Sequence, residues 1–165
     1  MVRTASVADA GGIARVHIAA WQVAYEGVFS RDFLGSLDLE VRTGWWEALL
    51  LREKRVTFVA DSGDSVVGFS LIGPSDDTGW GEVFAIYVDP AHWAKGFGRE
   101  LLTASEVQLA EDGFERAQLW VLEGNDLARG VYERQGWVKG KPIRLETIGG
   151  TEITEVRYER DLELP

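Results

Sequence analysis

A short glycine-containing turn is the feature of this sequence with the clearest chemical meaning. An apolar run ends at Asp89-Pro90, and the turn that follows carries Gly96 and Gly98 before an amphipathic segment begins. The first turn of a helix leaves backbone N–H groups unpaired and carries a partial positive charge, and glycine leaves room for a ligand to approach. The pattern predicts a phosphate or pyrophosphate site, with Lys95 and Arg99 adding positive charge. A tight strand-to-helix turn without a ligand is the alternative.

Several other chemistries are disfavoured by what the sequence lacks. It contains neither a Walker A pattern nor the Gly-x-Gly-x-x-Gly fingerprint of dinucleotide-binding folds, so a nucleotide-binding domain is disfavoured. There are no cysteines, which excludes disulfides, thiolate metal sites and cysteine nucleophiles. Only His17 and His92 offer imidazole groups, and we expect no metal. We therefore expect acid–base chemistry to use carboxylates, tyrosine, water or the backbone.

Glu82 is a candidate general base, because it opens an apolar run that extends to Val88. Apolar surroundings disfavour the charged form of a carboxylate, so such a group can accept a proton near neutral pH. An amine that arrives as ammonium needs such an acceptor before it can attack. An edge glutamate that points into solvent is the alternative.

A second motif runs from Asn125 to Trp137. Asn125 is a good helix N-cap. Tyr132 falls on the same helical face as Leu127, Ala128 and Val131, which by itself indicates a core tyrosine.

Together the two motifs resemble those of the GNAT family of N-acetyltransferases. The segment from Trp93 to Gly98 is similar to its motif A, Gln/Arg-x-x-Gly-x-Gly/Ala, with Trp93 in place of the usual Gln or Arg. The segment from Asn125 to Trp137 is similar to Asn-x-x-Ala-x-x-x-Tyr-Glu-x-x-Gly-Phe, with Trp137 in place of Phe.

The resemblance implies roles for individual residues. Tyr132 protonates the departing thiolate of coenzyme A. Glu82 stands 14 residues before Gly96, the spacing of the catalytic glutamate in the histone-acetyltransferase branch. The other implied contacts are with acetyl-CoA, as co-substrate: its pyrophosphate lies on the backbone of Trp93, Ala94, Lys95, Gly96, Phe97, Gly98 and Arg99, and its pantetheine and thioester lie near Ile86, Tyr87, Val88, Asn125 and Ala128.

The acceptor is less constrained. Trp21, Tyr25 and Phe29, with Phe33, are candidate walls of its groove, although helix packing explains such aromatic residues equally well. A small amine, an aminoglycoside, a polyamine, an amino acid and a protein N-terminus all stay open. So does a second class of function, a catalytically silent acyl-CoA-binding module that regulates or senses.

The elements that must position these residues follow from apolar periodicity and turn residues. Strands are expected at 2–4, 56–60, 66–72, 82–88, 117–122, 143–148 and 153–159, and helices from Ser6 to about Ala24 and at 39–52, 97–112 and 125–135. The second helix should bury Trp45, Leu49 and Leu50. This order predicts an α+β fold, and the resemblance adds a mixed, mostly antiparallel sheet of about six or seven strands that splays between strands 4 and 5.

Length and charge set the remaining expectations. The chain has 165 residues, which fits one domain over 1–165, and no apolar stretch resembles a signal peptide or membrane span, so a cytoplasmic setting is expected. A net charge of −10 should repel nucleic acid and anionic membranes and favour a cationic partner such as an alkylammonium substrate. Solubility alone also explains the charge, and a homodimer stays open.

Overall fold

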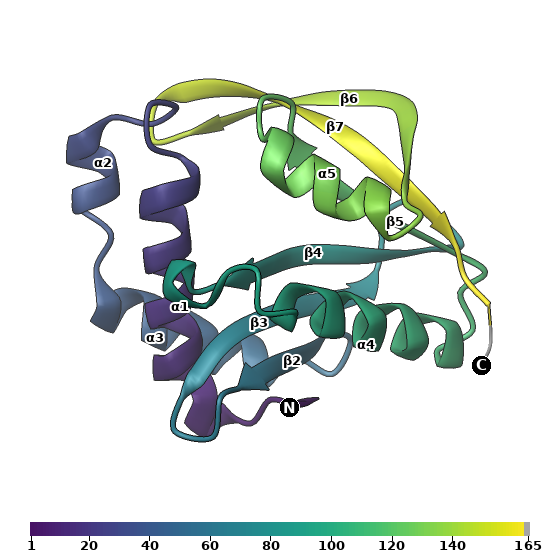
Figure 1. The fold of residues 1–165 in the computed structure, drawn as a ribbon, viewed down its shortest axis with the longest axis horizontal. Coiled ribbons are helices and arrows are strands. Elements are labelled where there is room, and N and C mark those ends of the chain that lie inside the picture. Colours follow the sequence, from purple (N-terminus) through teal and green to yellow (C-terminus); the bar gives the residue numbers. More distant parts are fainter. Residues whose placement is uncertain (164–165) are drawn as a thin grey trace.

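The computed structural model describes residues 1–163, and its centre is a seven-stranded sheet in the order β1-β2-β3-β4-β5-β7-β6. Neighbouring strands are antiparallel except for the parallel pair β4 and β5, which confirms the predicted mixed sheet (Figure 1). The strands are β1 (Val2–Thr4), β2 (Val56–Asp61), β3 (Val66–Pro74), β4 (Trp80–Val88), β5 (Arg116–Leu122), β6 (Val138–Ile148) and β7 (Thr151–Asp161). The last two are longer than predicted, because β6 resumes its pairing with β7 beyond an irregularity between Lys139 and Ile143.

Five helices join these strands. They are α1 (Ala10–Ala24), α2 (Arg31–Gly35), α3 (Leu39–Leu50), α4 (Phe97–Glu111) and α5 (Asp126–Arg134). The first helical turn after Ser6 is a 3₁₀ turn, and the Ser6 N–H donates to the Asp9 carboxylate at 2.8 Å. The sequence did not predict α2, which is too short to show periodicity. No helix within 1–163 has the length and apolar character needed to cross a bilayer.

The sheet splays where the parallel strands meet, as predicted. Pairing between β4 and β5 runs from Trp80 opposite Arg116 to Val83 opposite Leu119. Beyond Val83, β4 continues to Val88 without pairing to β5, while its pairing with β3 persists as far as Gly68 opposite Val88. From Phe84 to Val88, the edge of β4 that faces β5 therefore has no paired strand. We call this opening between the two strands the gap.

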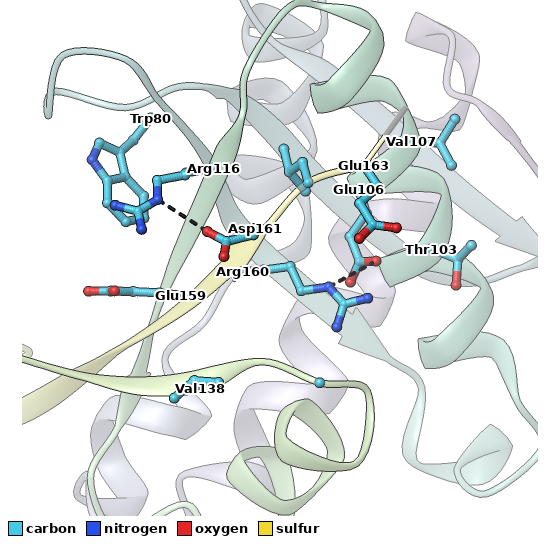
Figure 2. Close-up of a pocket in the computed structure, with 12 residues that line it drawn as sticks. Trp80, Thr103, Glu106, Val107, Arg116, Val138, Glu159, Arg160, Asp161 and Glu163 are labelled. Atoms are coloured by element: carbon cyan, nitrogen blue, oxygen red, sulfur yellow. Dashed lines mark hydrogen bonds and ion pairs between the residues drawn. The ribbon is translucent and has the colours of Figure 1, made fainter. Parts of the chain in front are cut away.

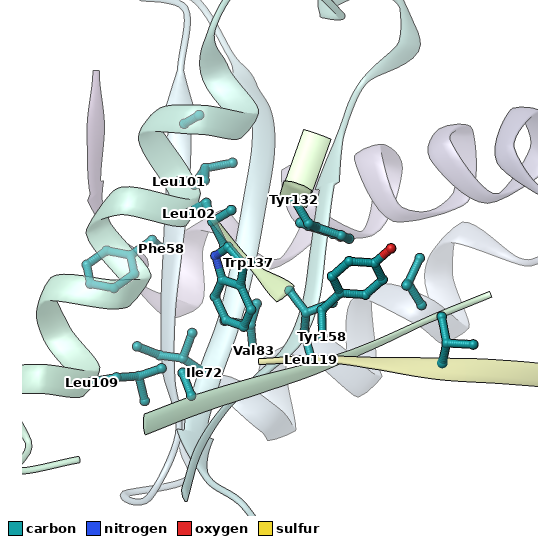
Figure 3. Packing of buried hydrophobic residues seen from close by; sticks show 14 of the residues in the cluster. Phe58, Ile72, Val83, Leu101, Leu102, Leu109, Leu119, Tyr132, Trp137 and Tyr158 are labelled. Carbon is teal, nitrogen blue, oxygen red and sulfur yellow. The ribbon is translucent and has the colours of Figure 1, made fainter. Parts of the chain in front are cut away.

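The larger core fills the face of the sheet covered by α4 and α5. Figure 3 shows the Trp137 indole among side chains of α4 and the sheet, beside Leu102 and Val83. Tyr132 belongs to the same core, and its ring lies 6.1 Å from that of Tyr158. The prediction that Leu127 faces inward is wrong: it is 62% exposed, because the helix presents Tyr132 to the sheet instead.

The opposite face of β3 and β4 is covered by α1 and α3. Trp46 is fully buried there, and its indole N–H donates to Nδ1 of His17 at 3.2 Å. The His17 ring also stacks on Tyr87 at 5.4 Å. The predicted burial of Trp45 is wrong, since this residue is 48% exposed and Trp46 takes the inward position.

Adjacent tryptophans in α3 provide a matched test of this packing. We expect Trp46→Ala to lower the free energy of unfolding by about 3 kcal/mol or more, because it empties a core site and leaves His17 without its donor. Trp45→Ala should cost less than about 1 kcal/mol. Chemical denaturation of both variants measures the difference, and equal losses would contradict the assigned orientation of α3.

Candidate active site

The free edge of β4 presents backbone groups to the gap. The N–H of Asp89 donates to the carbonyl of Val67 in β3 at 2.8 Å. Backbone groups alternate sides along a strand, so the N–H groups of Val88 and Ile86 are directed away from β3, toward the gap. The indole N–H of Trp93 donates to the Val88 carbonyl at 2.8 Å, which occupies that carbonyl and leaves the Val88 N–H as the exposed donor.

The turn that follows β4 leads directly into α4 through two left-handed residues. Ala94 has φ +60° and Gly96 has φ +92°. A left-handed residue next to right-handed ones directs successive N–H groups to one side, which is the geometry of anion-binding backbone concavities. The Lys95 ammonium donates to the Ala91 carbonyl at 3.2 Å, so it lies back along the turn.

Gly98 is not explained by the protein's own packing. A Cβ placed on it would meet only the Val88 side chain, at an ordinary contact distance of 3.7 Å, and its φ is not in the left-handed region. Gly96, in contrast, is required by its backbone conformation. The bare surface at Gly98 therefore fits a group that is held against the start of α4 from outside.

The second motif places a cap and a hydroxyl beside the gap. The Asn125 side chain accepts from the N–H of Ala128 at 3.1 Å and so caps α5. Tyr132 is 9% exposed, and its hydroxyl has no hydrogen-bond partner in the described part of the chain. Burial raises the pKa of Tyr132, and the nearby Tyr87 adds to the effect. The hydroxyl therefore keeps its proton at neutral pH.

Glu82 lies where the splay begins, on the face opposite Tyr132. It is 7% exposed and accepts a hydrogen bond from the side-chain amide of Gln118 at 3.0 Å. Its neighbour Val83 points into the α4 face, so the Glu82 carboxylate points to the α1 face. The two predicted catalytic groups thus approach the gap from opposite faces of the sheet.

The aromatic residues predicted to line the acceptor groove lie in two places, beside the gap and in a small hydrophobic core. The hydroxyls of Tyr25 and Tyr87 meet at 3.1 Å. Phe29 is buried with Leu34 and Ile153 of β7, and the Trp21 ring stacks on it at 5.9 Å. Phe33 packs at the edge of the same cluster. Tyr25 therefore brings a polar group to Tyr87 of β4, and the indole N–H of Trp21 lies near the Tyr87 hydroxyl.

Two contributions to this region are not visible in the sequence alone. Arg55, just before β2, lies with its guanidinium 3.4 Å from the centre of the Phe84 ring. Gln118 of β5 contacts both Glu82 and the Ser75 hydroxyl. Both contacts depend on strand register, which no local motif encodes.

A hollow of about 430 Å³ lies away from this region, at the paired end of β4 and β5 (Figure 2). Ion pairs span it, Arg116 with Asp161 at 3.1 Å and Arg160 with Glu106 at 3.8 Å. It contains none of the predicted site residues. Within residues 1–163, no three His, Asp or Glu side chains come together as a metal site requires.

Comparisons with known proteins agree with this geometry. A family model described as "Acetyltransferase (GNAT) family" matches residues 18–137. "Uncharacterized N-acetyltransferase YuaI" of Bacillus subtilis is 35% identical over 128 residues, which cover 75% of this chain and 72% of that protein. "Probable N-acetyltransferase Rv2775" of Mycobacterium tuberculosis is 26% identical over 95% of this chain and 91% of its own.

A solved structure extends the likeness to the fold. PaiA N-acetyltransferase of Thermoplasma acidophilum, crystallised in complex with coenzyme A, superposes with a TM-score of 0.74 over 98% of both chains at 18% identity.

Proposed function

Since this chain belongs to the GNAT family of acetyltransferases, we propose that it transfers an acetyl group from acetyl-CoA to a primary amine within one ternary complex. The observation that carries the proposal is the turn before α4, which is left-handed at Ala94 and Gly96 and bare at Gly98, set beside the unpaired edge of β4. The turn offers the backbone N–H groups that bind a diphosphate, and the unpaired edge offers those that bind an extended arm containing amides.

The turn and the β4 edge hold the donor in this proposal. Backbone N–H groups between Ala94 and Arg99 bind the diphosphate of coenzyme A, and Gly98 gives it room. Pantetheine lies along β4 and meets Val88 first, because this residue is nearest to the turn, and it pairs there as an added strand would. The thioester at the far end of this arm reaches the next unpaired donor of the edge, the Ile86 N–H, which donates to its carbonyl.

The chain's own groups then serve the transfer. Glu82 accepts a proton from the incoming ammonium, directly or through water, and the neutral amine forms the new C–N bond. The Ile86 N–H stabilises the negative charge that develops on the carbonyl oxygen. As the C–S bond breaks, Tyr132 donates its proton to the sulfur, and the second proton lost by the attacking nitrogen restores the tyrosine through solvent. The sum is an amide, a free thiol and one released proton, with no covalent enzyme intermediate.

A silent acyl-CoA-binding module shares the same donor site but releases no thiol. Two measurements on the purified chain separate the cases: calorimetric binding of coenzyme A, and thiol release from acetyl-CoA with a panel of amines. Binding with amine-dependent release supports the enzyme. Binding without release supports the silent module, and no binding contradicts both.

Gly98→Ala tests the donor site without disturbing the fold. An added methyl group meets only Val88 at 3.7 Å and favours the helix, so thermal stability should be kept or raised. The same methyl intrudes on the space assigned to the diphosphate, and we expect affinity for coenzyme A to fall at least fivefold. Gly44→Ala in α3, where an added Cβ meets no atom within 4 Å, is the control. Unchanged affinity in Gly98→Ala argues against the assigned cradle.

A further inference from the structure

A missing side chain in β3 lets a cation reach the catalytic face of β4. The Arg55 side chain crosses β3 at Gly73. A Cβ on Gly73 would lie 3.1 Å from Cδ of Arg55 and 2.6 Å from the Lys54 carbonyl oxygen. Any larger residue at this position would displace Arg55, so Gly73 is the gap through which the guanidinium reaches Phe84.

The guanidinium is buried in part without a polar partner. Its Nη1 atom is shielded from solvent and makes no hydrogen bond with any residue between 1 and 163. The Phe84 ring, 3.4 Å away, stabilises the charge but accepts no hydrogen bond of ordinary strength. A buried donor left without a partner destabilises the free protein, and a ligand that supplies an acceptor recovers this free energy on binding.

Glu82 lies beside this cation on the same face. It is the cross-strand partner of Gly73, over which Arg55 passes. Its resolved hydrogen bond comes from the neutral amide of Gln118. Among the described residues, Arg55 and Glu82 form no ion pair within 4.0 Å. The Glu82 carboxyl group and the Arg55 guanidinium are thus neighbours that do not form an ion pair.

A second cation near Gln118 is already engaged. Arg157 pairs with Asp77 at 3.1 Å and with Glu159 at 2.6 Å, and it also donates to the side-chain oxygen of Gln118 at 3.3 Å. Arg55, in contrast, makes no ion pair within 4.0 Å among residues 1–163, so its guanidinium is available to a ligand.

We propose that the acceptor is a free α-amino acid, whose carboxylate binds Arg55 while its ammonium faces Glu82. This inference rests on the proposed acetyl transfer. An α-amino acid carries both charges on neighbouring atoms, as the pair of side chains requires. A simple amine or a peptide N-terminus lacks the carboxylate and leaves Nη1 unpaired, and sites with buried polar groups reject such ligands strongly.

Matched substrates test the assignment. Thiol release is measured for each common L-amino acid and for its primary amide, which keeps the shape but loses the negative charge. We expect kcat/KM for the best amino acid to exceed that of its amide at least tenfold. Arg55→Met should reduce this ratio at least tenfold, mainly through KM for the acid. The acid and amide differ in amine basicity by the same factor in both proteins, so this difference cancels when the ratio of Arg55→Met is compared with that of the wild type.

Two further variants keep the test sharp. Arg52→Met removes an exposed arginine from the same turn and should preserve the ratio. Arg55→Lys retains the charge without the planar fork and should retain part of the ratio, which serves if Arg55→Met does not fold. If the wild type uses amides as well as acids, the amino-acid assignment is wrong but acetyl transfer stands. The same holds if Arg55→Met loses equal activity with both substrates. Coenzyme A binding without release from any amine overturns the transfer itself.

Discussion

Tyr132→Phe is expected to lower kcat at least tenfold while leaving the affinity for coenzyme A almost unchanged. The substitution removes only the hydroxyl proposed to protonate the leaving sulfur. A thiol has a pKa of about 8.5, so a thiolate leaves more readily when a phenol in contact supplies a proton. Burial raises the pKa of Tyr132, so its proton is present throughout the neutral range. Steady-state thiol release and calorimetric titration together measure the effect.

A neighbouring tyrosine provides the control. The Tyr158 hydroxyl accepts from Arg129 at 3.2 Å and donates to Glu133. Tyr158→Phe should therefore reduce stability and spare turnover. The Tyr132 hydroxyl has no partner within residues 1–163, so its removal should leave stability nearly unchanged. Normal turnover in Tyr132→Phe would falsify the acid assignment.

Glu82→Gln is expected to lower kcat/KM about 100-fold near pH 7. General bases contribute roughly 10²–10⁴-fold to rate. Glutamine has the size of glutamate and can still accept from Gln118, so the local structure should persist. Steady-state thiol release with a saturating donor measures the loss.

Glu123→Gln is the matched comparison. This glutamate follows β5 at an exposed position and lies outside the proposed site. Its replacement changes the net charge by the same amount and should leave the rate intact. A rate that stays normal in Glu82→Gln assigns the proton transfer to water or to another group.

Most of the sheet was predictable because its signals are local. The turn between β2 and β3, the apolar run of β4 and the glycines that follow α4 and α5 each lie within a few residues of the element that they define. Which residues of α3 face the core was not predictable in this way. Apolar residues surround that helix, with Leu39, Val41 and Trp45 all exposed, so periodicity does not select Trp46 as the buried one.

The same distinction between local and long-range signals applies to the candidate site. Residues that share a motif, such as Gly96 with Gly98 and Asn125 with Tyr132, are visible in the sequence because their spacing is short and fixed. The path of Arg55 over Gly73 requires the register of two hairpins. The bond from Trp93 to the Val88 carbonyl requires the turn to fold back on its own strand. Long-range geometry of this kind has no sequence signature of its own.

The histidine buried beneath Trp46 makes the native state sensitive to acid. Burial lowers the pKa of His17 to about 3, and the positive charge of Arg42 adds to the effect. In the unfolded chain His17 binds a proton near pH 6.5, whereas in the folded protein it does so only near pH 3. The free energy of unfolding therefore decreases by about 1.4 kcal/mol for each unit that the pH falls between these values. His17 stacks on Tyr87 of β4, so the strand that borders the proposed donor site shares in this loss of stability. Inactivation at low pH therefore includes a loss of the native fold.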